Sequence, residues 1–265
     1  MQTAAATWQQ LTEEEVRQFI EQGYVAVRGA FSRELAVRIL PLVWAELEID
    51  VQDLSTWTQP RTTLQKILTA PPVPEIYTQR YLSAIDDLCG IGRWHASRGA
   101  GYWPIVLPGF FSLPWKPPRG GWHLDSRLEI YHLATPDRAL VGLELFTDSK
   151  PGGGGTAIRI GSHHVVARLL AEAEPQGLKQ RELQLRSAAS TAHLPMVEIN
   201  GQAGDVILMH PFTVHASSPN TGNRVRVIAN KPVWFCEPMN LDRQNAADYS
   251  PVERAIVGAI SRIHG

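Results

Sequence analysis

The sequence predicts a mainly β fold with flanking helices, arranged as a sandwich or barrel of jelly-roll type. From Tyr102 onward, short runs of β-forming residues are separated by Gly and Pro turn signals. The preceding part instead shows apolar residues at helical spacing. With 265 residues, the chain has the length of one large β domain with helical additions. We therefore expect one domain over residues 1–265, with a helical part at about 11–95, a β core at about 100–236 and a C-terminal helix at about 250–263.

Helix boundaries are clearest near the N-terminus. Thr12 and Glu15 stand at the positions of a capping box, Gly23 ends the helical pattern that follows, and Ser32 is placed to cap a second helix. Pro41 falls within that second pattern and should kink or restart the helix. The expected elements are a helix over 13–21, a strand over 24–27, a helix over 33–47, a polar and Pro-rich loop over 50–75 with a short helix at 63–68, and a helix over 75–88.

The second part of the chain is expected to contain short strands. They are 102–106, 123–130, 140–146, 156–160, 196–199, 205–214 and 225–235. Between them, residues 165–173 are expected to form a helix. Residues 175–192 are polar and irregular, and form either a lid over the site or a solvated surface excursion. The glycine run 152–155 lacks the Lys-Ser/Thr of a phosphate-binding loop, which favours a tight turn.

Charge and cysteine content narrow the function classes. The 25 basic residues balance 26 acidic ones, so there is no electrostatic footprint for nucleic acid. Cys89 and Cys236 are too few for a disulfide framework and are expected to be reduced thiols. No leader sequence is recognised, and no apolar run approaches the roughly 20 residues that span a bilayer. We expect a soluble, cytoplasmic protein that acts on a small molecule, without nucleic-acid or membrane partners.

Two stretches carry side chains that can share a metal ion. In Trp122-His123-Leu124-Asp125, His123 and Asp125 would point to the same face of a strand. A further histidine, His215, lies far downstream. Two imidazoles and one carboxylate form the facial triad of non-haem Fe(II) oxygenases, which leaves three coordination positions for a co-substrate and O₂. Zn²⁺ also accepts these ligands, so a zinc hydrolase is an alternative.

The stretch around His215 is expected to form a β-hairpin. If residues 219–222 form a symmetric four-residue loop, His215 lies opposite Arg226, and Ser217 shares their face. A metal ligand, a hydroxyl group and a permanent cation would then lie together. That combination suits a metal that also holds a small dianionic acid.

Two neighbouring residues compete for these roles. His210 is separated from His215 by an odd offset, so the two would point to opposite faces of a regular strand and cannot both be ligands. With His210 as the ligand, the geometry of the arginine and the serine is lost. Arg224 would lie opposite Ser217, still on the His215 face, and competes with Arg226.

These motifs resemble the phytanoyl-CoA dioxygenase family of Fe(II)/2-oxoglutarate-dependent oxygenases, over most of the chain and in order. The resemblance is carried by Leu11-Thr12-Glu13 through Phe19, Gly23-Tyr24, Val27-Arg28-Gly29, Trp122-His123-Leu124-Asp125, Gly155-Thr156, Gly161-Ser162-His163, and Gly204-Asp205 through Arg226. There are two departures: Ile160, where a Pro usually precedes the Gly-Ser-His, and Ala216, where a Gly often follows the ligand His. Neither departure touches a metal-binding position.

The resemblance implies a double-stranded β-helix fold and an Fe(II)/2-oxoglutarate-dependent oxidation. His123, Asp125 and His215 would hold Fe(II), while Arg226 and Ser217 would bind 2-oxoglutarate. A C–H bond of a small organic molecule would be hydroxylated, or otherwise oxidised, while 2-oxoglutarate and O₂ are converted to succinate and CO₂. Asp125 favours this reaction over halide transfer, because related halide-transferring enzymes carry a small residue there. A non-catalytic, ligand-binding β-barrel that retains these residues is a further alternative.

Residues near the metal motifs are candidates for substrate contacts. Arg127 shares the face of the metal ligands and could meet an anionic substrate. Trp103 and Trp122 could line an apolar pocket, although aromatic residues also fill β cores. A CoA thioester would need a basic phosphate patch, for which Lys116 and Arg119 alone give little support.

Overall fold

The computed structural model describes residues 8–50, 53–125, 127–135 and 138–261. Its α-helices are α1 (Glu13–Gln22), α2 (Arg33–Trp44), α3 (Gln79–Cys89), α4 (Ser162–Glu172), α5 (Gln180–Ser190) and α6 (Pro251–Ser261). Its strands are β1 (Tyr24–Val27), β2 (Arg61–Leu68), β3 (Trp94–His95), β4 (Ala100–Val106), β5 (Ile130–Tyr131), β6 (Leu140–Leu145), β7 (Thr156–Arg159), β8 (Leu178–Lys179), β9 (Met196–Glu198), β10 (Val206–Met209), β11 (His215–Ser217) and β12 (Arg226–Phe235). Short 3₁₀ helices are η1 (Leu54–Thr56), η2 (Val73–Ile76) and η3 (Ala246–Asp248).

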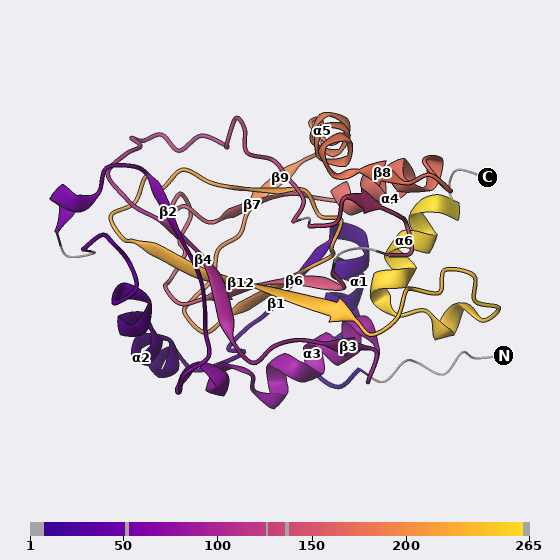
Figure 1. The fold of residues 1–265 in the computed structure, drawn as a ribbon, viewed down its shortest axis with the longest axis horizontal. Helices are drawn as coiled ribbons and strands as arrows, with labels where there is room; N and C mark the ends of the chain where they lie inside the picture. The colour runs from indigo at the N-terminus through magenta and orange to yellow at the C-terminus, as the bar shows by residue number, and fades with distance from the viewer. Residues whose placement is uncertain (1–7, 51–52, 126, 136–137, 262–265) are drawn as a thin grey trace.

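The strands form the helix-flanked jelly roll that the sequence predicts. The larger sheet has the order β1-β10-β6-β12-β4-β2, with β3 also paired to β12, and a smaller sheet has the order β11-β7-β9. The pairings are antiparallel. In Figure 1, β7 and β9 lie on one side of β6 and β12, whereas α2 and α3 lie on the other. The two sheets therefore face each other, and helices cover the outer face of the larger one.

Alternate residues of the central strands pack into two different cores. Leu143 and Leu145 of β6 pack with Ile228 of β12 in a small core that also includes β7. The intervening positions join a larger core that contains buried residues from all the α-helices named above. Because side chains alternate along a strand, Arg226 and Asn230 share the inward face of Ile228. β12 therefore directs every second side chain into the space between the two sheets.

Capping rules predicted the N-terminal elements. Oγ1 of Thr12 accepts a hydrogen bond from N of Glu15 (3.2 Å), and the Glu15 carboxylate accepts one from N of Thr12 (2.8 Å). Gly23 ends α1 with a left-handed backbone (φ 89°), and Ser32 caps α2. α2 continues past Pro41 without a break, so the helix does not restart there.

The short helix predicted at 63–68 is wrong, because these residues belong to strand β2. β2 pairs with β4, and the register shifts between Leu64 and Ile67. It lies at the edge of the larger sheet, where β-branched Thr62 and Thr63 suit a pleated strand. Pairing with a distant strand outweighs the local spacing of apolar residues.

The predicted hairpin is also wrong. The strand expected over 205–214 ends with β10, and the following residues, including Pro211, form a turn. β11 pairs with β7 in the smaller sheet, whereas β12 pairs with β3, β4 and β6. His215 therefore does not lie opposite Arg226 in a ladder.

Residues 123–130 and 175–192 also differ from expectation, and the two segments pair with each other through short strands. Instead of a strand over 123–130, the described residues there contain an isolated bridge from His123 to His215 and the start of β5. Residues 175–192 are not irregular, because they contain β8 and α5. β5 pairs with β8, so each segment supplies the partner that the other needs.

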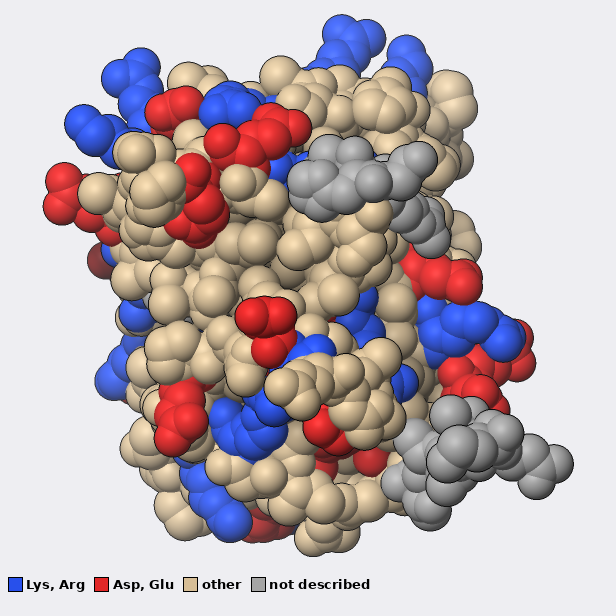
Figure 2. Space-filling view, turned by 90° about the vertical axis from the view of Figure 1, so that its right-hand side faces the viewer, with Lys and Arg blue, Asp and Glu red and all other residues tan. Residues whose placement is uncertain are grey.

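The C-terminal helix is confirmed as α6 as far as Ser261, and residues 262–263 of the expected helix lie outside the described part of the chain. None of the helices in the described residues has the length and apolar composition that a membrane span requires. On the face shown in Figure 2, basic and acidic side chains are interspersed. This agrees with the balanced charge of the sequence.

Candidate metal centre

His123, Asp125 and His215 come together at one point in the structure. Their ligand atoms all lie within 4.8 Å of one another. Nε2 of His123 and Nε2 of His215 lie 3.7 and 3.8 Å from Oδ1 of Asp125. These distances are too long for hydrogen bonds, but two ligands that are each about 2.1 Å from one ion can be up to about 4.2 Å apart. The donor set therefore fits a shared metal ion.

Backbone hydrogen bonds hold the two imidazoles beside each other. N of His123 donates to O of His215 (2.9 Å), and N of His215 donates to O of His123 (3.0 Å). Nδ1 of each ring faces a carbonyl oxygen. For His123 this is O of Gly121 (2.8 Å), and for His215 it is O of Thr213 (3.0 Å). Because a carbonyl only accepts, Nδ1 carries the proton and the lone pair is left on Nε2. The nitrogens that face Asp125 are therefore the ones able to bind a metal.

The carboxylate of Asp125 is oriented by two side chains. Nδ2 of Asn230 donates to Oδ2 of Asp125 (2.7 Å), and Nη1 of Arg138 lies 3.5 Å from the same oxygen. Burial raises the pKa of Asp125, but His215, Arg138 and the Asn230 hydrogen bond outweigh burial and lower it below its ordinary value. The carboxylate is therefore ionised at neutral pH, while Oδ1 remains directed towards the imidazoles.

His215 is neutral at physiological pH. Burial is the main cause that lowers the pKa of His215 to about 4, and the charge of Asp125 opposes this shift only in part. A neutral imidazole is the form that binds a metal ion. The site is thus prepared to bind a cation without first losing a proton from His215.

Arg226 is a buried cation that donates hydrogen bonds to neutral oxygen atoms. Its Nε donates to O of Gly154 (2.7 Å), its Nη1 to O of Pro104 (3.2 Å) and its Nη2 to Oγ of Ser217 (3.4 Å). Within the part of the chain that the structure describes, no carboxylate forms an ion pair with it. Burial lowers the pKa of Arg226 to about 10, partly opposed by Glu198, so the group stays charged at neutral pH. Because a buried, unpaired charge is costly, this site favours an anionic ligand.

Strands β11 and β12 set the distance between the ligand cluster and this cation. His215 and Ser217 are two residues apart on β11, which corresponds to about 7 Å. On β12, Arg226 and Asn230 are four residues apart, which corresponds to about 13 Å. Asn230 is the residue that contacts Asp125. The arrangement suits a ligand that reaches a metal at one end and carries a carboxylate at the other.

The two competing residues lie elsewhere. His210 is buried between Phe19 and Phe212, with ring centroids 6.0 and 5.3 Å away, and burial lowers its pKa to about 3. It is not part of the cluster of ligand atoms. Arg224 is exposed in the turn before β12. Geometry therefore favours His215 and Arg226.

The residues predicted to contact substrate are dispersed. The guanidinium of Arg127 lies over the ring of Tyr102 at 4.7 Å, and Tyr102 has a left-handed backbone (φ 52°). Trp122 is half-buried beneath the guanidinium of Arg159 at 4.2 Å. Trp103 is fully buried in the larger core, so it fills the core instead of lining a pocket. Substrate contacts of Arg127 and Trp122 stay predictions.

Two residues that orient Asp125 were missed from the sequence. Asn230 could have been found, because alternation along the last predicted strand places it on the face of Arg226. Arg138 could not have been found in this way, because it lies before β6, outside any strand, and only the folded structure shows that it lies near Asp125.

A hollow of about 460 Å³ is lined by residues that stand close to two of the metal ligands in the sequence. Its lining includes Gly120, just ahead of the His-X-Asp motif, and Ser217 of β11. Arg61, Lys116 and Arg119 also line it, and no Asp or Glu does. Among the described residues, none of these three cations forms an ion pair. A concave surface of one charge sign concentrates ligands of the opposite sign.

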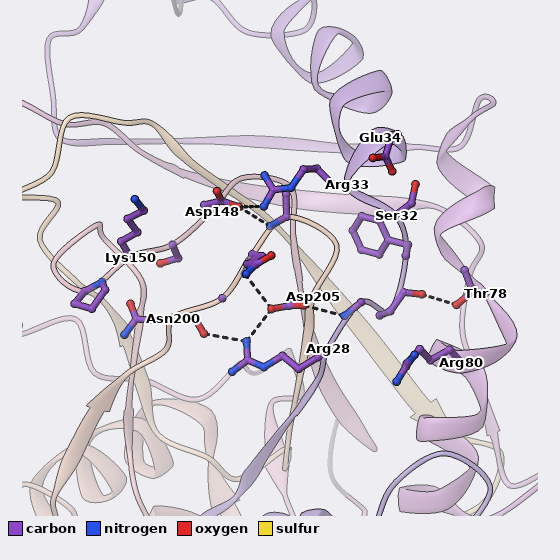
Figure 3. Close-up of a pocket in the computed structure, with 18 residues that line it drawn as sticks. Arg28, Ser32, Arg33, Glu34, Thr78, Arg80, Asp148, Lys150, Asn200 and Asp205 are labelled. Atoms are coloured by element: carbon purple, nitrogen blue, oxygen red, sulfur yellow. Dashed lines mark hydrogen bonds and ion pairs between the residues drawn. The ribbon is translucent and has the colours of Figure 1, made fainter.

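A wider hollow of about 1170 Å³ is lined by other residues (Figure 3). Its main charged groups are paired with each other: Nη1 of Arg28 donates to Oδ2 of Asp205 (2.7 Å), and Nη2 of Arg33 donates to Oδ1 of Asp148 (2.6 Å). None of its lining residues stands within three positions of a metal ligand in the sequence, whereas Gly120 and Ser217 of the first hollow do. The chemistry of a metal site therefore belongs to the first hollow and not to this one.

A family model covers the part of the chain that holds these motifs. Residues 110–228 match the family described as Phytanoyl-CoA dioxygenase (PhyH). The matched stretch contains the ligand cluster, Ser217 and Arg226. The resemblance seen in the sequence is confirmed across these residues. No curated protein matches the chain.

Solved structures resemble this chain in fold. EctD from S. alaskensis, in its apoform, is 18% identical with a TM-score of 0.55, over 91% of this chain and 85% of that one. SnoK, a non-heme alpha ketoglutarate dependent carbocyclase from nogalamycin biosynthesis, is 20% identical with a TM-score of 0.51, over 88% and 87%. HygX from Streptomyces hygroscopicus, with nickel, 2-oxoglutarate and hygromycin B bound, is 14% identical with a TM-score of 0.52, over 84% and 87%. The likeness shows a shared jelly-roll fold.

Proposed function

Because residues 110–228 match the phytanoyl-CoA dioxygenase family model, we propose that this chain is a non-haem Fe(II)/2-oxoglutarate-dependent dioxygenase. It hydroxylates, or otherwise oxidises, a C–H bond of a small organic molecule. When bound, Fe(II) with 2-oxoglutarate and O₂ supplies the oxidising chemistry, in which 2-oxoglutarate is converted to succinate and CO₂. The helical part and the β core act as one domain, because side chains from both share the larger core.

The chain's own residues prepare the metal site. His123, Asp125 and His215 would hold the Fe(II), since their donor atoms already converge. The carbonyl groups of Gly121 and Thr213 keep the proton on Nδ1 of each imidazole, and so leave Nε2 for the metal. Such outer partners fix the orientation of the ligands before the metal arrives.

The co-substrate is held at the other end of the space. Arg226 would pair with the distal carboxylate of 2-oxoglutarate, and Ser217 would add a hydroxyl hydrogen bond. A planar guanidinium can bind both carboxylate oxygens in a fork and stays charged when buried. HygX, which shares the fold, was crystallised with 2-oxoglutarate and nickel, and this supports the same pairing of metal and acid here.

The buried guanidinium of Arg226 is the observation that carries the proposal. The ligand cluster alone also suits a zinc hydrolase. A hydrolase that needs only zinc and water would leave this buried charge without a partner. A non-catalytic β-barrel could use Arg226 to bind an acid, but it has no need of metal ligands prepared for a cation.

The hollow of about 460 Å³ bears on the substrate. Arg61, Lys116 and Arg119 favour a substrate that carries a carboxylate or phosphate group. These three residues replace Arg127 as the main candidates for recognising an anion. HygX was crystallised with hygromycin B and SnoK belongs to nogalamycin biosynthesis, which supports a small-molecule substrate in general.

Anaerobic addition of Fe(II) and 2-oxoglutarate tests this function. We expect a visible charge-transfer absorption that requires both components, followed by succinate release when a suitable substrate and O₂ are supplied. A zinc hydrolase would show no such absorption. A non-catalytic barrel could show the absorption, but no small molecule would stimulate succinate release.

A further inference from the structure

One side chain of α5 holds the residue that separates two of the metal ligands. Oε1 of Gln184 accepts a hydrogen bond from N of Leu124 (2.9 Å), and Nε2 of Gln184 donates to O of Leu124 (2.6 Å). Leu124 is buried and stands between His123 and Asp125. A carboxamide offers a donor and an acceptor side by side, so it can satisfy both backbone groups of one residue. Gln184 thereby fixes the backbone of the His-X-Asp motif.

This contact takes the place of a strand ladder. The described residues of 124–129 belong to no strand, so the backbone groups of buried Leu124 need partners other than a neighbouring strand. Besides Gln184, the hydroxyl of Tyr131 accepts hydrogen bonds from N of Arg127 (2.6 Å) and N of Leu128 (2.9 Å). Side chains therefore give this loop the order that a neighbouring strand provides elsewhere.

The segment before α5 is attached to the same loop at further points. The Glu174 carboxylate accepts a hydrogen bond from N of Leu133 (2.8 Å), and N of Gln180 donates to O of Glu129 (2.9 Å). β8 pairs with β5 between these two contacts. The metal loop and the α5 segment are thus fastened together along their length.

The far end of α5 is attached to the other side of the motif. Nη1 of Arg159 donates to Oγ1 of Thr191, just after α5, at 2.9 Å. The same guanidinium lies 4.2 Å from the ring centroid of Trp122, the residue before His123. Contacts with α5 therefore bracket the motif on both sides.

We propose that Gln184 is a positioning residue for the metal site and that docking of α5 is coupled to metal binding. The inference rests on the proposed function, because it assigns a metal to His123 and Asp125. Fixing the residue between them limits how far the two ligands can move apart. Coupling between two sites is reciprocal, so a metal ion that needs the docked arrangement also stabilises docked α5.

Titration with Co(II), monitored by its d–d absorption, tests the positioning role in the full-length protein. Gln184→Met keeps the length of the side chain but removes both hydrogen bonds. We expect Co(II) binding to weaken by about 10-fold or more, with a changed d–d spectrum, because outer partners of metal ligands contribute on this scale. Leu185→Ala is the control, since Leu185 is the next residue on α5 and its side chain is exposed. It should leave affinity and spectrum unchanged.

Two results would overturn the inference. One is Co(II) affinity and a spectrum in Gln184→Met equal to those of the wild type. The other is an equal loss of affinity in Leu185→Ala, which would indicate a general effect of disturbing α5. If Gln184→Met does not fold, Gln184→Asn, which keeps the amide but shortens it by one methylene, provides the same comparison. Failure of the wild type itself to bind Co(II) would instead refute the proposed function, and this inference with it.

Hydrogen exchange tests the reciprocal effect. We expect Co(II) to slow exchange of the α5 amides in the wild type and to have a smaller effect in Gln184→Met. Amides of α2, which lies across the larger sheet, serve as the internal reference. Equal exchange of α5 with and without Co(II) in the wild type would contradict the coupling.

Discussion

Nη2 of Arg226 lies 3.4 Å from Oγ of Ser217, although the strands that carry the two residues belong to different sheets. β11 supplies the serine from the smaller sheet, and β12 supplies the arginine from the larger one. The contact therefore crosses the interior of the jelly roll. Under the proposed function, this hydroxyl group and this cation would bind the distal carboxylate of 2-oxoglutarate.

Replacement of Arg226 by Gln should raise the 2-oxoglutarate concentration needed for half-maximal turnover. A charge-assisted hydrogen bond contributes roughly 1.5–3 kcal/mol, so an increase of about 10-fold or more is expected. The measurement is succinate release as a function of 2-oxoglutarate concentration. Arg224→Gln is the matched control, because Arg224 is exposed. A larger effect in the control than in Arg226→Gln would move the role to Arg224.

Replacement of His123 by Ala should abolish metal-dependent turnover and leave the fold intact. The His123 side chain is 47% exposed, so its loss removes a ligand without opening a cavity. Metal titration and circular dichroism measure the two expectations separately. His95→Ala is a suitable control, since His95 is an exposed histidine that stacks on Trp234. Unimpaired turnover in His123→Ala would contradict the ligand assignment.

Capping and turn rules predicted the helices whose ends are fixed by residues within or next to the helix itself. The capping box of Thr12 and Glu15 and the left-handed Gly23 define α1 wherever it packs. Elements that depend on distant partners were mistaken. β2 is a strand because β4 pairs with it, and α5 is ordered against Leu124, more than 50 residues upstream in the chain. Neither partner can be identified from the segment alone.

The residues of the candidate site also fall into those that the sequence predicts and those that only the fold reveals. His123, Asp125 and His215 could be predicted because few residue types bind metals and their spacing is restrictive. The hairpin argument predicted that Arg226 lies near Ser217, and the two are in contact, although the predicted pairing is wrong because β11 and β12 belong to different sheets. Gln184 gave no signal, because an amide side chain acquires a role only from what it touches.

Replacement of Asn230 by Ala should weaken metal binding. The variant loses the 2.7 Å hydrogen bond to Oδ2 of Asp125, so the carboxylate can rotate away from the imidazoles. Loss of such an outer partner typically lowers metal affinity about 10- to 100-fold. Co(II) titration measures the effect, with exposed Asn240→Ala as the control. Equal affinity in Asn230→Ala and the wild type would exclude an orienting role.

The basic hollow predicts a preference for acidic substrates. In a screen of small metabolites for stimulated succinate release, carboxylates and phosphates should be more active than their amides or dephosphorylated forms. For a substrate found in this way, Lys116→Gln combined with Arg119→Gln should raise its KM and leave the 2-oxoglutarate requirement unchanged. The same changes at Arg80 and Lys150, in the wider hollow, are the control. A preference for neutral compounds would refute the assignment.

Glu253 should make folding stability depend on acid pH. Burial raises the pKa of Glu253, but hydrogen bonds from Arg93 and from N of Ser250, together with the charge of Arg243, lower it to about 2. Its side chain is 0% exposed and lies 2.6 Å from Nη2 of Arg93. Because the folded pKa lies below the unfolded value, the contribution is fully present above about pH 4.5 and is lost as pH falls towards about 2.

The depressed pKa of Glu253 corresponds to about 3 kcal/mol of folding stability. Glu253→Gln, which mimics the protonated form, should therefore be less stable than the wild type by about this amount at neutral pH. The difference should shrink when urea unfolding is repeated at about pH 3, because Glu253 then binds a proton in the unfolded wild-type chain while it stays largely ionised in the folded one. Glu14→Gln, at an exposed position on α1, should show no comparable difference at either pH. A constant difference between Glu253→Gln and the wild type at both pH values would mean that the effect comes from packing and not from the charge of Glu253.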